Sequence, residues 1–330
     1  MNAFERHMND WQTNWRQQNI SSTDHGEQNR KAYSWIVPRS LWKETIWEGI
    51  RHSLPAYLET GIQRHSGSHN LKSSWMLSAN LYFPFRCDSG RALLAEFLRD
   101  QVDPRIQTVD AVELEYEEPR HSELHPSKLL CEDNGTRGAG QTSPDIGFHV
   151  NDYSGLVLTE VKFTEHSFYG CSARRRQDGS DPEKRPGNPD PARCESLTTI
   201  LADVKTQCHQ VRWGRRYWEH LQPVMADNIP ARGCPAARTG YQLFRQQALA
   251  EGIAASGKYD FVLSCAAIDE RNEVLKVNLN SLGWDRLFAG NVRFKIFTHQ
   301  DWVNWVRAHD LTGKWAGWLQ YVLDRYDFAA

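Results

Sequence analysis

The sequence predicts an α/β fold, with a mixed central β-sheet flanked by helices and an α-rich N-terminal part. Two observations lead to this prediction. Apolar residues recur at helical spacing through the N-terminal third, and later segments either alternate apolar with polar residues or form short apolar runs. The chain has 330 residues, of which 40% are hydrophobic, so it can bury a sizeable core in one large domain or two modest ones.

The N-terminal third is expected to form helices. Apolar residues recur at intervals of four and five over 41–65, where Pro55 predicts a kink or a break. Further helices are expected over 73–83 and 92–98. Residues 1–30 are polar and charged, so we expect a flexible N-terminal arm, except where two tryptophans four residues apart indicate a short helix that docks on the body.

Strands are expected from the middle of the chain onward. After Val112, apolar residues alternate with Glu113, Glu115 and Glu117, which places the three glutamates on one face of a strand. A turn over 151–155 is expected to join the next two strands as a hairpin. The remaining expected elements are strands over 145–150, 156–163, 261–267, 274–279 and 292–297, and helices over 197–221, 239–255, 301–308 and 314–326.

The body of the protein, residues 31–330, is expected to carry an insertion near 171–236 and a C-terminal helical addition over 299–330. The stretch 176–193 holds many Pro, Asp, Gly, Arg and Lys residues and almost no apolar ones, so we expect it to be exposed and poorly ordered. The C-terminal addition is rich in tryptophan. Such residues are more often part of a core than a partner-binding surface.

Composition excludes little about function. The formal net charge is -2, so any contact with a nucleic acid must come from a local basic patch. No stretch reaches the roughly 20 apolar residues that span a bilayer, and the N-terminus lacks an apolar signal core. We therefore expect a cytoplasmic protein with no membrane contact.

The sequence pairs an aspartate at the start of one expected strand with a Glu-x-Lys in the next. Asp145 follows Pro144, and Glu160 and Lys162 flank Val161 in an apolar strand. Because side chains alternate along a strand, Glu160 and Lys162 share a face while Val161 points into the core. Taken singly, these features are more often a turn opener and a solvated ion pair. Together, carboxylates that hold a hard divalent cation and an ammonium that orients water or offsets charge are typical of phosphodiester hydrolysis.

This pattern resembles the signature of the PD-(D/E)xK nuclease superfamily. The resemblance implies a restriction-endonuclease-like core in 31–330 and cleavage of DNA with Mg²⁺ or Mn²⁺. It also implies that Asp145 and Glu160 bind the metal and that Lys162 is catalytic. Many members add an acidic residue from an earlier element, which here indicates Glu115 as a further catalytic and metal-binding residue. Its rivals are the strand residues Glu113 and Glu117 and the helical residues Glu44 and Glu48.

A later helix adds to the resemblance. The run Gly240-Tyr241-Gln242-Leu243-Phe244-Arg245 resembles the glutamine and tyrosine helix that follows the catalytic strands in RecB-like members, which implies that Gln242 holds the attacking water or a phosphate oxygen. Alternatively, Tyr241 and Phe244 are core residues and Gln242 and Arg245 face solvent. With the runs His69-Asn70-Leu71-Lys72-Ser73-Ser74 and Asn80-Leu81-Tyr82-Phe83, residues 69–267 look like an uncharacterised group of bacterial restriction-endonuclease-like proteins.

Seven cysteines in a reducing compartment are better explained as free thiols or metal ligands than as a disulfide framework. Cys171, Cys194, Cys208 and Cys234 are candidate ligands of zinc or an iron–sulfur cluster, and His209 is a possible substitute ligand. Some RecB-like nucleases carry such a cluster. The chain has no Cys-x₂-Cys pair, so scattered thiols are the alternative.

Basic residues interleaved with aromatic ones are candidates for contact with a nucleic acid. Arg212, Arg215 and Arg216 lie beside Trp213 and Tyr217, and Arg245 lies on the later helix. Charge runs are often only solvated. A second basic group comprises Arg174, Arg175, Arg176, Lys184 and Arg185.

The function that these observations favour is a metal-dependent nuclease that cleaves DNA in restriction, phage defence or repair. An RNA-directed nuclease on the same core is one alternative, because its active-site residues would be identical. A nucleic-acid-binding module without activity is another, and a partner-binding protein is suggested only by the 13 tryptophans. The resemblance also implies a homodimer as one possible assembly.

Overall fold

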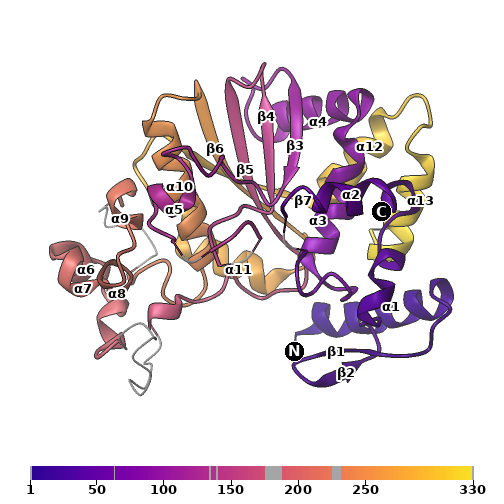
Figure 1. Cartoon of the computed structure of the whole chain (residues 1–330), viewed down its shortest axis with the longest axis horizontal. Coiled ribbons are helices and arrows are strands. Elements are labelled where there is room, and N and C mark those ends of the chain that lie inside the picture. Colours follow the sequence, from indigo (N-terminus) through magenta and orange to yellow (C-terminus); the bar gives the residue numbers. More distant parts are fainter. Residues whose placement is uncertain are drawn as a thin grey trace.

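A computed structural model describes residues 2–62, 64–133, 135–138, 140–174, 188–224 and 232–328. At its centre is a five-stranded sheet of order β3-β4-β5-β6-β7 (Figure 1). The strands are β3 (Val109–Leu114), β4 (Ile146–Val150), β5 (Gly155–Lys162), β6 (Phe261–Ile268) and β7 (Arg293–Thr298). The pairs β3–β4 and β4–β5 are antiparallel, whereas β5–β6 and β6–β7 are parallel. The predicted α/β class with a mixed sheet is confirmed.

The hairpin of β4 and β5 closes through three residues in left-handed backbone. Asn151 and Asp152 both have φ 55°, which short polar side chains adopt readily, and Tyr153 follows with φ 62°. The register pairs Ile146 with Thr159 and Val150 with Gly155. The turn therefore sets which residue of β5 lies opposite the start of β4.

Helices cover both faces of the sheet (Figure 1). On one face, α3, α4 and α12 pack in a core with Val112, Phe148, Val161 and Leu263; on the other, α10 packs over Leu158 and Val262.

The longer helices are α1 (Ala3–Asn19), α3 (Ser74–Tyr82), α4 (Asp88–Gln101), α10 (Tyr241–Ala255), α11 (Glu273–Leu282), α12 (His299–His309) and α13 (Ala316–Tyr326). The short helices are α2 (Ser53–Leu58), α5 (Pro126–Leu129), α6 (Leu197–Ala202), α7 (Val204–Gln207), α8 (His209–Arg212) and α9 (Tyr217–His220). The 3₁₀ segments are η1 (Arg39–Thr45), η2 (Glu48–Ile50), η3 (Phe83–Arg86), η4 (Ser172–Arg174), η5 (Pro191–Glu195) and η6 (Trp284–Arg286).

The N-terminal segment differs from the expected flexible arm. Helix α1 lies along α13, where the Gln12 side chain donates to the Arg325 carbonyl at 2.6 Å and the Trp15 ring meets the Tyr321 ring edge-on. A hairpin of β1 (Gly26–Gln28) and β2 (Lys31–Tyr33) follows. The tryptophan pair therefore marks a helix that docks on the body, and that helix covers most of the predicted arm.

Three expected elements are different in the structure. The segment 41–65 forms only η1, η2 and α2, because the chain extends at Ile46 and Trp47, where the Trp47 amide donates to the Asn80 side chain at 2.8 Å. The segment 197–221 divides into α6 to α9, because Asp203 caps a new helix and Gly214 has φ 82°.

The third difference is 274–279, which is predicted as a strand and lies in the helix α11. Its residues alternate in polarity, but Leu275 and Leu279, four apart, are the buried pair, while Val277 is 62% exposed. Asn272 caps the helix and Gly283 ends it in left-handed backbone.

Of the expected insertion, 175–187 and 225–231 lie outside the described residues, and with them Arg175, Arg176, Lys184 and Arg185. Among the described residues, none of the helices combines the length and the apolar character that a membrane span requires.

The C-terminal addition is part of the core, and Trp302 is its centre. The indole is fully buried against Tyr82, Phe85 and Phe97, and it donates to the Leu81 carbonyl at 3.1 Å. We predict that Trp302→Ala lowers the free energy of unfolding by about 3–5 kcal/mol, measured by urea denaturation. Leu311→Ala, at a position that is 94% exposed, should change it by less than about 0.5 kcal/mol. Equal effects of the two substitutions would contradict this packing.

Candidate active site

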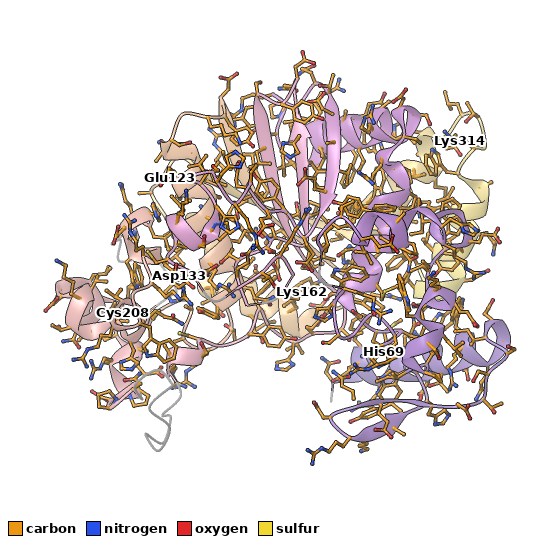
Figure 2. All side chains as sticks on the ribbon, in the orientation of Figure 1. His69, Glu123, Asp133, Lys162, Cys208 and Lys314 are labelled. Atoms are coloured by element: carbon orange, nitrogen blue, oxygen red, sulfur yellow. The ribbon has the colours of Figure 1, made fainter. Side chains whose placement is uncertain are left out.

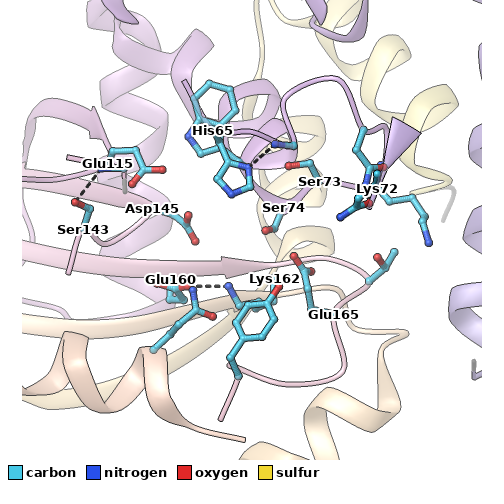
Figure 3. Close-up of a pocket in the computed structure, with 18 of the residues that line it drawn as sticks. His65, Lys72, Ser73, Ser74, Glu115, Ser143, Asp145, Glu160, Lys162 and Glu165 are labelled. Carbon is cyan, nitrogen blue, oxygen red and sulfur yellow. Dashed lines mark hydrogen bonds and ion pairs between the residues drawn. The ribbon is translucent and has the colours of Figure 1, made fainter. Parts of the chain in front are cut away.

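Three carboxylates and one ammonium, from three elements, meet at one end of the sheet (Figure 3). Asp145 immediately precedes β4, Glu160 and Lys162 lie near the end of β5, and Glu115 follows the last residue of β3. All four line a cavity of about 600 Å³. The antiparallel register places Asp145 beside Glu160, and the Val161 amide donates to Asp145 Oδ2 at 2.7 Å.

The side chains of β5 alternate between the apolar core on one side of the sheet and the polar cavity on the other. Val161 is fully buried in the core beneath α3 and α12. Glu160 and Lys162 point the other way, toward α10, and only 5% and 3% of their surfaces are exposed. Alternation along one strand thus supplies both the apolar anchor and the polar pair.

Glu115 reaches the site through an unusual backbone conformation. Its φ is 52°, which is uncommon for a residue with a Cβ, and its amide donates to the Asp145 carbonyl at 2.9 Å. The Arg137 side chain donates to the Glu115 carbonyl at 2.6 Å, and the Trp75 side chain hydrogen-bonds to its carboxylate. Strain of this kind is typically retained where the surrounding contacts hold a functional group in place.

The residues considered as alternatives to Glu115 do not reach the cavity. Glu113 forms ion pairs with Arg137 at 3.7 Å and His149 at 3.5 Å. Glu117 accepts from the His125 ring at 2.7 Å and from the Gln141 side chain at 2.6 Å. Neither residue lines the cavity, and neither do Glu44 and Glu48.

The buried carboxyl groups of Asp145 and Glu115 hold their protons more tightly than exposed ones do. Burial, followed by the neighbouring Glu160 carboxylate, raises the pKa of Asp145 to about 8. Burial, then Asp145 and Glu160, raise the pKa of Glu115 well above its usual value. These shifts mean that placing an added cation in the cavity would favour the ionised carboxylates.

Lys162 is held in its charged form. Burial alone would lower its pKa, but the carboxylates of Glu160 and Asp145 outweigh burial and raise the pKa above its ordinary value. The ammonium lies 2.7 Å from Glu160 Oε1. The buried His299 ring bonds to the Lys162 carbonyl at 2.9 Å, which fixes the backbone at the end of the strand.

The N-terminal part of α10 supplies two further residues. Gln242 lines the cavity, and its side-chain oxygen is buried without a hydrogen-bond partner among the described residues. Arg245 also lines the cavity, but its guanidinium pairs with the buried Glu132 carboxylate at 3.0 Å. Phe244 is core, as the alternative prediction has it, whereas Gln242 and Arg245 face the cavity rather than open solvent.

The N-terminal part contributes residues to the cavity that sequence reasoning did not assign to the site. Lys72, Ser73 and Ser74 precede or open α3, His65 lies in the loop before them, and Glu165 follows β5 (Figure 3). In the sequence, these positions were indicated only by the run 69–74, which formed part of the family resemblance but was not assigned a function. The cavity wall continues to Tyr33 and Trp35, whose rings lie 5.0 Å apart.

The other predicted arginines lie away from this cavity. Arg212 is exposed on α8, and Arg216 pairs with Glu219 at 2.7 Å. Arg215 is only 7% exposed and donates to the Cys131 carbonyl. None of the three lines the cavity around Asp145.

The donor atoms fit a hard divalent cation in kind. Carboxylate oxygens are the ligands that Mg²⁺ and Mn²⁺ prefer, and three carboxylates face one polar cavity. Among the residues described, no three His, Cys, Asp or Glu side chains are already drawn together as a metal-binding set. At this site, Lys162 donates to Glu160 and the Val161 amide donates to one oxygen of Asp145.

The fold and the carboxylate site define a restriction-endonuclease-like α/β protein. The comparison with known families agrees, because residues 8–326 match the family described as "Restriction Endonuclease associating with ARP". The match covers nearly the whole chain, so the protein belongs to this family, which supports a nuclease-like role. No curated protein and no solved structure matches the chain.

Because the pKa of Asp145 is raised, the stability of the folded protein should depend on pH. With its pKa raised to about 8, the folded protein binds a proton there more tightly than the unfolded chain, so this residue makes stability fall as the pH rises from about 4 to 8. Without divalent cations, Asp145→Asn should raise the melting temperature at pH 8 and leave it nearly unchanged at pH 4. Asp10→Asn, on the exposed side of α1, is the control. A gain of equal size at both pH values would contradict the assignment.

Proposed function

We propose that the protein is a metal-dependent nuclease of the PD-(D/E)xK type that hydrolyses phosphodiester bonds of DNA. The observation that carries this proposal is the meeting of Asp145, Glu160 and Lys162 in one buried cavity, with Glu115 as a fourth member. Family membership supports the nuclease part of the proposal. Of the candidate biological roles, restriction is the one that the family description favours.

Asp145, Glu160 and Glu115 would hold Mg²⁺ or Mn²⁺ through their carboxylates. When bound, the cation supplies a water of lowered pKa and offsets charge on the phosphate. Because the pKa of Lys162 is raised, this residue is an ammonium at neutral pH and acts by stabilising the negative charge that develops on the phosphorus oxygens. A general-base role for Lys162 is the less favoured alternative.

Gln242 is suited to position the attacking water. Its side-chain oxygen is an acceptor with no partner among the described residues, and it lies in the same cavity as the carboxylates. A water O–H directed to this oxygen would leave a lone pair of the water free for in-line attack. The amide cannot remove a proton, so Gln242 is an orienting residue.

The walls of the cavity support a nucleic-acid strand as the substrate. The Lys72 ammonium lies 4.6 Å from the Trp35 ring, which in turn contacts Tyr33. A second cavity of about 580 Å³ adjoins the first through shared residues and includes the exposed Arg30 and Arg39. Aromatic faces beside cations are typical of contact with bases and phosphates. DNA is the substrate we propose, and RNA is an outcome of the test below.

The direct test is cleavage of linear, circular and single-stranded DNA and of RNA, with Mg²⁺, Mn²⁺ or a chelator. We predict metal-dependent cutting that falls at least about a hundredfold in Glu160→Ala, which removes a metal ligand, and in Lys162→Ala, which removes a cation beside the reacting phosphate. Glu44→Ala, a residue outside the cavity, should cut normally. Binding without cutting under any divalent ion would instead favour a module without activity. Cutting of RNA alone would replace the proposed substrate.

The role of Glu115 has its own matched comparison. Glu115→Gln should weaken Mg²⁺ activation at least about tenfold, because a carboxylate that faces the metal site is lost. Glu117→Gln, two residues along and hydrogen-bonded elsewhere, should leave the Mg²⁺ dependence unchanged. The measurement is the cleavage rate as a function of Mg²⁺ concentration. Equal shifts in both variants would remove Glu115 from the metal site.

A further inference from the structure

A lobe of very short helices lies beside the catalytic body. Helices α6 to α9 have four to six residues each, and they gather at one side of the molecule (Figure 1). Helices of this length are not stable in water by themselves, because nucleation is unfavourable and few bonds follow it. Packing of α9 against α10 stabilises part of the lobe, and a bound metal is a further constraint that small modules often use.

Four of the seven cysteines converge inside this lobe. Cys171 precedes η4, Cys194 lies in η5, Cys208 separates α7 from α8, and Cys234 precedes α10, yet all four line one small cavity. Cys208 lies in the lobe, well apart from Lys162 in the active site (Figure 2). The other three cysteines lie outside this cavity, and all seven thiols are free.

Backbone and side-chain contacts hold the four cysteines around the cavity. The Cys234 amide donates to the Cys194 carbonyl at 2.8 Å, and the Cys171 amide donates to the Ala236 carbonyl at 2.9 Å. The Trp218 indole lies 3.3 Å from the sulfur of Cys208. Residues up to 63 positions apart in the sequence are thus brought to one point by the path of the chain rather than by local spacing.

The size of the cavity limits the occupant. Its volume is about 20 Å³, and a cavity of roughly 10–15 Å³ is the least that holds one water molecule. A single ion fits that space. Soft thiolates in a set of four are the ligands of structural zinc.

We propose that Cys171, Cys194, Cys208 and Cys234 bind one structural Zn²⁺ ion that holds the short helices of this lobe together. No three of the described His, Cys, Asp and Glu side chains stand as a closed ligand set, so binding draws the thiols inward across the cavity. The proposal does not depend on the nuclease activity.

The test is the zinc content of the full-length protein, purified without chelators and measured by elemental analysis. We expect about one zinc per chain, released by a mercurial reagent, and loss of that zinc in Cys208→Ser and Cys234→Ser. Cys87→Ser, at an exposed thiol outside the cavity, is the matched control and should retain the full equivalent. Substoichiometric zinc in the unaltered protein, or full zinc in both lobe variants, would overturn the proposal.

A second measurement keeps the proposal testable if the serine variants do not fold. Exchange of the bound ion for Co²⁺ in the unaltered protein should give the visible absorption of a tetrahedral cobalt–thiolate site. Absorption typical of oxygen ligands only would contradict a four-cysteine site. Iron with acid-labile sulfide in place of zinc would overturn the single-ion assignment.

Discussion

The antiparallel pairing of β4 with β5 is the constraint on which the site depends. The pairing places Asp145 beside Glu160, and the amide of the intervening core residue, Val161, holds one oxygen of Asp145. A shift of one residue in register would turn Glu160 and Lys162 into the core and Val161 into the cavity. The left-handed turn at 151–153 and the burial of Val161 oppose such a shift, so the same contacts that stabilise the sheet position the chemistry.

The charge distribution follows from this placement. Asp145, Glu160 and Glu115 are brought into one cavity with Lys162, and Glu115 enters it where the chain leaves β3 in a left-handed conformation. The folded protein therefore carries an electrostatic cost that an added cation would relieve. The lobe of helices α6 to α9 differs in its candidate metal ligands, which are soft thiols around a small apolar cavity instead of hard carboxylate oxygens. The two sites suit different metals, and we propose that the two metals have different tasks.

Local patterns were enough to predict that Asp145, Glu160 and Lys162 lie together. Asp145 immediately precedes β4, and the other two lie on β5 within 18 residues of chain, so alternation and one turn determine their arrangement. The predicted strand carried Glu113, Glu115 and Glu117 on one face, but β3 ends at Leu114 and only Glu115 of the three lines the cavity. Its left-handed backbone depends on contacts with Arg137 and Asp145, which no local pattern reveals. Lys72 and His65 reach the cavity through packing of the N-terminal part against the sheet, which no local pattern reveals.

The incorrectly predicted elements have a common cause. In 274–279, Val and Leu alternate with polar residues in a way that fits a strand, yet Leu275 and Leu279 also fit one face of a helix, and the cap at Asn272 decides for the helix. The period over 197–221 likewise continues past Asp203, where a side-chain cap starts a new helix. Side-chain caps and long-range packing override periodicity in both segments.

The most direct test of the account is the position of Mn²⁺ in crystals of the protein, located by its anomalous scattering. The account predicts a peak within about 2.6 Å of carboxylate oxygens of Asp145 and Glu160, with the Lys162 ammonium displaced from its present contact. A map in which Mn²⁺ occupies other surface sites while Lys162 stays bound to Glu160 would contradict a metal-dependent catalytic centre at the end of this sheet.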